Sequence, residues 1–222
     1  SDETAPFGAV LRLLWDRKSF RFMALGAGLN AFAGYSSANW TASFMIRSHG
    51  MSTGELGTWL AVIMGVFGAI GVFYGGVIAD RLAPKDKRWY MWIPAIACFL
   101  SAPFLAGAYL AGGPYTALLL SFIPGLCFNV YVGNTIASTH GLVGLRMRAT
   151  SSAILFFILN MVGLGLGPWS VGLLSDYLEP TLGTESLRHA MLYLLPAATV
   201  LSGLLFIFAA RHLREDLARA PD

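Results

Sequence analysis

Six long apolar stretches divide the chain, and short polar segments separate them. Each stretch has the roughly 20 residues that a helix needs to cross the hydrocarbon core of a bilayer. None of the six contains Asp, Glu, Lys, Arg or His. The stretches are approximately Phe22–Ile46, Leu56–Ile78, Met91–Ala111, Tyr115–Ser138, Thr150–Leu174 and Ala190–Ala210. The pattern predicts an all-α membrane protein with six transmembrane helices.

The composition supports this prediction because charged residues are scarce. They make up 12% of the chain, while hydrophobic residues make up 56% and the mean hydropathy is +0.63. A soluble domain has about 25% charged residues, so a water-facing surface cannot be built here. The 25 glycines and 10 prolines are scattered through the chain, and membrane helices tolerate both. A basic DNA-binding face needs a soluble domain to carry it, so no nucleic-acid partner is expected.

Positive charges gather on one side of the predicted bundle. Thirteen of the 15 Lys and Arg residues lie in the two tails and in the second and fourth loops, and only Arg47 and Arg188 lie opposite. Because cytoplasmic loops are rich in Lys and Arg, both ends of this segment are predicted to be cytoplasmic. The expected location is the plasma membrane, which is the inner membrane of a bacterium. The thirteen are Arg12, Arg17, Lys18, Arg21, Arg81, Lys85, Lys87, Arg88, Arg146, Arg148, Arg211, Arg214 and Arg219.

The sequence divides into three parts. Residues 1–21 form a predicted cytoplasmic amphipathic lead-in, 22–210 the six-helix transmembrane bundle, and 211–222 a cytoplasmic tail. The lead-in mixes apolar and basic residues, which suits either a helix at the membrane interface or a segment that anchors the first span. The chain begins SDETAPFG, without an initiating methionine or a secretory signal, so we expect it to be part of a longer protein.

The first half of the bundle matches the second half in sequence. The segment Asn30–Gly34 (NAFAG) recurs as Asn129–Gly133 (NVYVG), and Gly71–Asp80 matches Gly167–Asp176 in two glycines and the aspartate. A repeat of three helices must cross the membrane in opposite senses in its two copies. Inverted repeats of this kind are typical of secondary transporters. The two predicted repeats cover about 22–111 and 115–210.

Motifs in the second loop and the fifth stretch resemble those of the major facilitator superfamily. The second loop carries the pattern G-x-x-x-D-R followed by basic residues, although Ala83 and Pro84 replace the glycine that usually follows. Its residues are Gly76, Asp80, Arg81, Lys85, Lys87 and Arg88. The family's glycine-proline motif is similar to the set Gly163, Gly165, Gly167, Pro168 and Gly172. The resemblance covers essentially the whole chain and corresponds to the C-terminal six-helix half of the family.

Two shorter segments, Ser48–Glu55 and Arg146–Thr150, resemble bacterial spinster-type members, whose animal relatives are associated with sphingolipid and lysolipid export. The resemblance implies a secondary active transporter that moves a small amphipathic or lipid-like solute by alternating access. It also implies two partners, the lipid bilayer and an N-terminal six-helix half of the same protein. No cofactor is implied.

Three alternatives stay open. The chain could be a non-transporting receptor or scaffold module of the same fold, a six-span unit that pairs with itself, or part of a transporter for another small organic solute or drug. An enzyme is not expected because no nucleophile–base pair stands out. Cys98 and Cys127 are interpreted as small buried hydrophobes, and the four histidines lack companion metal ligands.

Polar side chains in the first and fourth stretches are predicted to line a substrate cavity. Inside a bilayer such groups must face a cavity or a helix contact, and for any single residue both alternatives stay open. A cavity is favoured for the set because the other stretches are poorer in amides. The candidates are Asn30, Tyr35, Ser37, Asn39, Trp40, Thr41, Asn129, Tyr131, Asn134, Thr135, Ser138 and Asn160.

The second loop is predicted to act as a cytoplasmic gate or latch. Asp80 falls at a helix C-terminus, where the helix dipole disfavours an anion, and it would pair with the other half and release on opening. The alternative is an ordinary turn with a solvated Asp80–Arg81 pair, worth less than about 1 kcal/mol. The helix-packing and hinge candidates are Gly71, Gly75, Gly163, Gly167, Pro168 and Gly172.

The absence of charge within the six stretches bears on energy coupling. A proton-coupled transporter needs a carboxylate or histidine that titrates along its pathway, and these stretches contain neither. We therefore expect any proton coupling, and any anchor for a charged headgroup, to lie in the N-terminal half.

Overall fold

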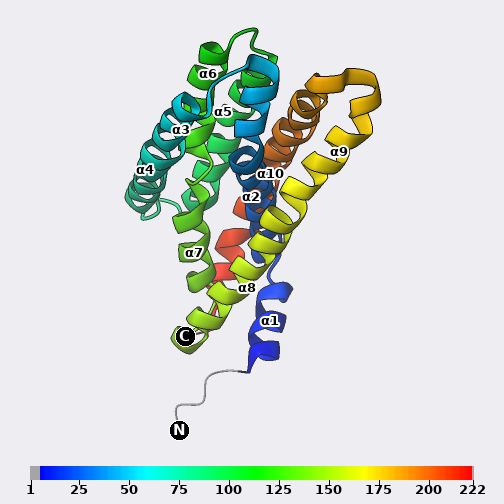
Figure 1. The fold of residues 1–222 in the computed structure, drawn as a ribbon. Helices are drawn as coiled ribbons and strands as arrows, with labels where there is room; N and C mark the ends of the chain where they lie inside the picture. Colours follow the sequence, from blue (N-terminus) through cyan, green and yellow to red (C-terminus); the bar gives the residue numbers. More distant parts are fainter. Residues whose placement is uncertain (1–5, 222) are drawn as a thin grey trace.

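The computed structural model describes residues 6–221, and these are almost entirely helical (Figure 1). Six rods run along the bundle, and a shorter helix, α1, precedes them. In chain order the six rods are α2, α3–η1–α4, α5, α6–α7, α8–η3–α9 and α10. The second and fifth rods each contain a π-helical segment, and the fourth contains a turn. The elements are α1 (Phe7–Asp16), α2 (Lys18–His49), α3 (Thr53–Leu60), η1 (Ala61–Phe67), α4 (Gly68–Leu82), α5 (Trp89–Leu110), α6 (Pro114–Cys127), α7 (Tyr131–Gly141), η2 (Leu145–Met147), α8 (Arg148–Asn160), η3 (Met161–Leu166), α9 (Gly167–Leu182), η4 (Gly183–Glu185) and α10 (Ser186–Ala218).

Four helical segments are long and apolar enough to cross a membrane, which identifies a membrane protein. They are Thr53–Leu82, Trp89–Leu110, Pro114–Gly141 and Leu145–Ala218. The last covers two rods, because the chain leaves the helical conformation at Gly183, where φ is 54°. Helix α2 is absent from the four, since amides and hydroxyls occupy much of its length. Each predicted stretch corresponds to one of the six rods, although the third runs one residue past the end of α5 at Leu110.

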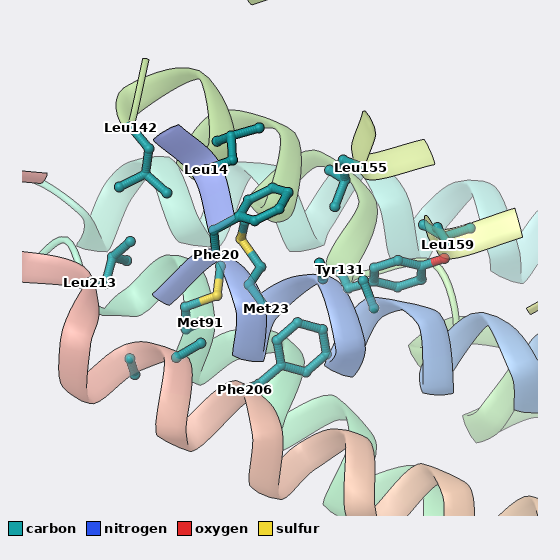
Figure 2. Packing of buried hydrophobic residues seen from close by; sticks show 14 of the residues in the cluster. Leu14, Phe20, Met23, Met91, Tyr131, Leu142, Leu155, Leu159, Phe206 and Leu213 are labelled. Carbon is teal, nitrogen blue, oxygen red and sulfur yellow. The ribbon is translucent and has the colours of Figure 1, made fainter. Parts of the chain in front are cut away.

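Buried hydrophobic residues form two large clusters at opposite ends of the bundle, and a small third cluster comprises Ala97, Cys127 and Val130. Figure 2 shows the first cluster, in which Phe20, Met23 and Phe206 pack together with side chains from α1, α5, α7 and α8. The second cluster centres on fully buried side chains such as Phe44 and Met191. Small residues fill much of the space between rods, as in membrane bundles where backbones approach closely.

The lead-in helix α1 packs against the bundle along one face. Val10 and Leu14 are completely buried within the first cluster. Phe7, Leu11 and Trp15 lie on the neighbouring flank of the helix and are exposed, while Arg12 and Asp16 lie on the opposite side. The helix is thus amphipathic over Phe7–Asp16, and the first five residues of the predicted lead-in lie outside the described part. Its position relative to the membrane stays a prediction.

Glycines let the second rod of each predicted repeat approach the first rod of the other repeat. A Cβ added to Gly71 would lie 1.8 Å from the carbonyl oxygen of Leu126, in the α6–α7 rod. A Cβ added to Gly163 would lie 2.6 Å from the Cβ of Ala31, in α2. Gly75 and Gly167 make the next contact along each pair of rods. Within each second rod a π-helical segment, η1 or η3, lies close to these contacts.

The C-terminal end of α10 caps the start of α2. The backbone N–H of Ser19 donates to Oδ2 of Asp216 at 2.8 Å, and Asp216 is only 6% exposed. Arg17 adds a bond from Nη2 to the carbonyl oxygen of Arg219 at 2.6 Å. The carboxylate satisfies a backbone donor that the first turn of α2 would otherwise leave unpaired.

Replacing Asp216 with alanine should therefore lower the free energy of unfolding by about 1–2 kcal/mol, because a helix cap is lost. Thermal unfolding of the purified protein in detergent, followed by tryptophan fluorescence, measures the change. Asp216→Asn is the matched control, since its amide oxygen still accepts the Ser19 bond. Equal midpoints for Asp216→Ala and the unmodified protein would show that the cap contributes nothing.

Candidate functional site

A cavity of about 380 Å³ lies where α2 faces the α6–α7 rod. The end of α3, the η1 segment, α5 and α8 contribute the rest of its wall. The lining is mostly apolar, and among the described residues that line it none is charged. Its polar side chains come mainly from α2 and from the α6–α7 rod, the first rods of the two predicted repeats.

The structure brings half of the predicted substrate-site residues to this cavity. Asn30 is buried and donates from Nδ2 to the carbonyl oxygen of Phe128 at 2.9 Å. Tyr35 donates its hydroxyl to Oδ1 of Asn160, at 3.4 Å. Ser37 lies 3.4 Å from the hydroxyl of Tyr109. The predicted residues at the cavity are Asn30, Tyr35, Ser37, Thr41, Asn129 and Tyr131.

Thr41, Asn129 and Tyr131 differ from the other polar side chains of the lining. None of the three side chains makes a hydrogen bond to another group in the part of the chain that the structure describes. Asn129 is half-buried, while Thr41 and Tyr131 are buried. Amides and hydroxyls inside a protein normally take hydrogen-bond partners, so these three groups are the ones most available to a bound solute.

The other predicted substrate-site residues lie away from the cavity, and most of them bond to helix backbone. Trp40 donates from Nε1 to the carbonyl oxygen of Pro168 at 2.9 Å and packs against Gly172. Asn39, Asn134, Thr135 and Asn160 each bond to a carbonyl four residues earlier, and Ser138 is buried with no bond to its hydroxyl within residues 6–221. Of the bonds just named, only that of Trp40 joins two helices, and any role of these side chains in solute binding stays a prediction.

The sequence did not predict several of the lining residues. Ser121, Gly125 and Phe128 line the cavity from α6 and from the turn after it. They are spaced four and three residues apart, which places them on one helical face. This face lies directly before Asn129 in the sequence, so following the helical spacing back toward the N-terminus would have found them. Tyr109 gave no such signal, because a single tyrosine near the end of an apolar stretch is ordinary.

Tyr109 is held in place from two sides. Its hydroxyl meets Ser37, while its carbonyl oxygen accepts a hydrogen bond from Nε of Arg188. Arg188 also donates to the carbonyl oxygen of Ala111 at 2.8 Å and to Glu185 at 2.9 Å. The pKa of the Glu185 carboxyl is lowered mainly by the hydrogen bond from Arg188, against the opposing effect of burial. Arg188 therefore satisfies two backbone carbonyl groups at the C-terminal end of α5, beside the cavity.

The predicted gate residues form only local contacts in the second loop. Asp80 is exposed and accepts a hydrogen bond from the hydroxyl of Tyr90 at 3.1 Å, and no ion pair joins it to Arg81 among the described residues. Arg88 instead pairs with Asp86, whose pKa is held below its ordinary value by hydrogen bonds from Arg88. Arg81, Lys85 and Lys87 are exposed. The latch function stays a prediction, in which these exposed groups await a partner.

The described residues contain no group of three or more His, Cys, Asp or Glu side chains placed to hold a metal ion. Cys98 and Cys127 are both buried and free.

Comparison with known proteins relates the chain to a family. An MFS-type efflux pump of Mycolicibacterium smegmatis is 31% identical over 201 residues, which are 90% of this chain and 47% of the relative. The chain is homologous to proteins of the major facilitator superfamily. Spinster homolog 3 proteins are also similar, with 24% identity in Danio rerio and 27% in Mus musculus, over 96% and 95% of this chain. These matches cover 47% and 44% of the two relatives. No protein-family model matches the sequence.

Solved structures show the same superfamily fold. A bacterial homolog of the human lysosomal transporter spinster matches with a TM-score of 0.70 in its inward-facing, unoccupied form, over 98% of this chain and 51% of that chain. The inward-facing, occupied form matches with a TM-score of 0.66, over 92% and 50%. The identity is 22% in both cases, so this likeness concerns the fold alone. The chain spans about half the length of the relatives that it matches, consistent with the C-terminal half of a superfamily transporter.

Proposed function

We propose that the chain is the C-terminal six-span bundle of a secondary active transporter that moves a small amphipathic or lipid-like solute by alternating access. The observation that carries this proposal is the uncharged cavity between α2 and the α6–α7 rod. Midplane sites between repeats are typical of secondary transporters. The relatives, which are named as an efflux pump and spinster homologs, support a role in membrane transport.

An inverted repeat is supported by the reciprocal glycine contacts. Gly71 brings the second rod onto the fourth, and Gly163 brings the fifth rod onto the first. A two-fold axis in the membrane plane would exchange these two contacts. The π-helical segments η1 and η3 occur in the second and fifth rods, as such an axis requires. We infer that all six rods span the membrane as two inverted three-helix repeats.

The proposed orientation places both ends of the segment in the cytoplasm of a bacterial cell, with the bundle in the inner membrane. The C-terminal tail meets the lead-in through Arg17 and Arg219, and it meets the second loop through Arg214 and Asp86, whose side chains lie 3.6 Å apart. The basic segments thus share one end of the bundle. Their common charge suits the cytoplasmic face.

The cavity lining favours an amphipathic or lipid-like solute. Side chains such as Ile63, Met64 and Leu159 offer apolar contact, while Asn129 and Thr41 offer hydrogen bonds without a charge. A solute with a long apolar part and a small polar part fits this surface better than a sugar or an inorganic anion.

Neutralising every carboxylate in the N-terminal spans should abolish proton coupling, because this half contains no titrating carboxylate or histidine within the predicted spans.

A transporter of another small organic solute or drug is the second candidate, because the relative from Mycolicibacterium smegmatis is named as an efflux pump. A receptor or scaffold module of the same fold is the third. Both the first and second candidates require a transport cycle, whereas the third does not.

Reconstitution of the full protein into liposomes tests the proposal. Uptake of a lysolipid panel and of a panel of cationic and neutral drugs is measured with and without an imposed pH gradient, and empty liposomes serve as the control. Saturable lysolipid movement supports the first candidate, and movement of drugs alone supports the second. Binding without net movement of any solute would overturn the proposal in favour of a receptor or scaffold.

A further inference from the structure

The α6–α7 rod is broken at the cavity. Helix α6 ends at Cys127 and α7 begins at Tyr131, and a turn over 128–130 joins them. Pro124 lies one turn before the break and lacks the N–H that an uninterrupted helix would use. Phe128 and Asn129, in the turn itself, line the cavity. The break therefore forms part of the cavity wall.

Several backbone carbonyls around the break accept hydrogen bonds that differ from the regular helical pattern. The Cys127 oxygen accepts from the N–H of Val130 at 3.2 Å, and the Asn129 oxygen accepts from the N–H of Val132 at 3.3 Å. The Phe128 oxygen accepts from Nδ2 of Asn30 at 2.9 Å. The Val130 oxygen accepts from Nδ2 of Asn134 at 3.0 Å. In an apolar environment a helix tolerates a break only when its freed polar groups are satisfied again, so the Asn30 amide, which bonds to the Phe128 oxygen, supports the break.

Asn30 differs from Asn134 because it reaches the break from another rod. Its side chain is 2% exposed, and its Oδ1 accepts a weak bond from the thiol of Cys98 in α5, with sulfur and oxygen 3.5 Å apart. Cys98 in turn lies 3.6 Å from the hydroxyl of Ser202, which donates to the carbonyl oxygen of Gly26 at 2.7 Å. This chain of contacts fixes the Asn30 amide against α5 and α10. The Phe128 carbonyl is thereby held to a rigid part of the bundle.

We propose that 128–130 is a hinge of the α6–α7 rod, and that Asn30 is the positioning residue that holds the rod in its interrupted form. Loss of the Asn30–Phe128 bond frees a carbonyl in an apolar site, which favours straightening or fluctuation of the rod. Either change moves Phe128 and Asn129 relative to α2 and so reshapes the cavity. The link from hinge to solute movement rests on the proposed transport function, whereas the hinge itself rests on the contacts alone.

Asn129 is the matched control for Asn30. It is the same residue type, it occupies the corresponding place in the second predicted repeat, and it lies in the turn itself. Its side chain lines the cavity but makes no hydrogen bond to another described residue. Removing its amide changes the polarity of the cavity without removing a partner of the broken backbone.

The two native thiols report on the hinge. Cys127 ends α6 directly before the break, and Cys98 contacts Asn30. Both are buried, so alkylation by N-ethylmaleimide requires local opening. The experiment uses the full protein in detergent, with cysteines elsewhere in the chain replaced by serine, and follows the modification of each thiol by mass spectrometry.

Asn30→Leu should speed alkylation of Cys127 about fivefold, the change expected from the loss of one hydrogen bond. Asn129→Leu should leave the rate unchanged. Equal rates for Asn30→Leu and the unmodified protein would overturn the hinge, and so would equal acceleration in both variants, because that pattern indicates general loosening of the cavity. Monodisperse elution and the thermal midpoint show whether each variant is folded.

Asn30→Asp gives an independent test within one folded variant. A protonated carboxyl can donate to the Phe128 oxygen, whereas an ionised carboxylate cannot. The rate of Cys127 alkylation, divided by that of the unmodified protein at the same pH, should be near one at low pH and rise about fivefold at high pH. A ratio that does not change with pH would contradict the proposed role of Asn30 in holding the hinge. Because no solute is needed, this result is independent of whether the protein transports lysolipids.

Discussion

Gly71→Ala is expected to destabilise the protein by roughly 1–3 kcal/mol, the range for inserting a carbon atom into a tightly packed interior. The added Cβ would lie 1.8 Å from the Leu126 oxygen and 2.9 Å from its carbonyl carbon. These are backbone atoms, so no side-chain rotation relieves the clash and the two rods must separate. Thermal unfolding in detergent and the yield of monodisperse protein measure the effect.

Gly76→Ala is the matched control, because Gly76 lies on the same helix and a Cβ there meets nothing within 4 Å. Alanine favours a helix over glycine by up to about 1 kcal/mol, so this variant should be as stable as the unmodified protein or slightly more stable. A Gly71→Ala variant that matched Gly76→Ala in midpoint and yield would show that the second and fourth rods do not pack as closely as described.

Ala38→Phe is expected to reduce transport at least about tenfold, since the phenyl ring would occupy the cavity that the solute needs. Ala38 lines the cavity yet is itself exposed, so a larger side chain can enter the open space without displacing the core. The change removes volume and no hydrogen bond. Uptake by proteoliposomes, together with the binding affinity for the same solute, measures the result.

Ala197→Phe serves as the control for this substitution. Ala197 is exposed on α10 in an apolar groove beside Pro103 and Pro196, outside the cavity. This variant should transport at the unmodified rate. Full transport by Ala38→Phe would place the solute pathway elsewhere in the protein, while equal loss in both variants would indicate a general effect of added aromatic surface.

The polar residues show how far the sequence could predict the site. Asn30, Ser37 and Thr41 recur at helical spacing in the sequence, and the structure places all three at the cavity. The same reasoning could not separate Asn129, which lines the cavity without a bond, from Asn134, which satisfies a carbonyl in its own helix. Both are amides in one apolar stretch, and only the break in the α6–α7 rod distinguishes their surroundings.

The amino-acid sequence by itself determined the class of protein, the positions of the apolar rods and the family resemblance. These follow from local properties, because the hydrophobic content and length of a stretch decide whether it suits a bilayer whatever its neighbours are. The tertiary structure decided which amides face open space, which glycines touch a neighbouring backbone and where a helix breaks. Each of these depends on atoms distant in sequence, as when Asn30 in α2 bonds to Phe128 after α6. Contacts of this kind arise from the packing of rods, which local pattern does not encode.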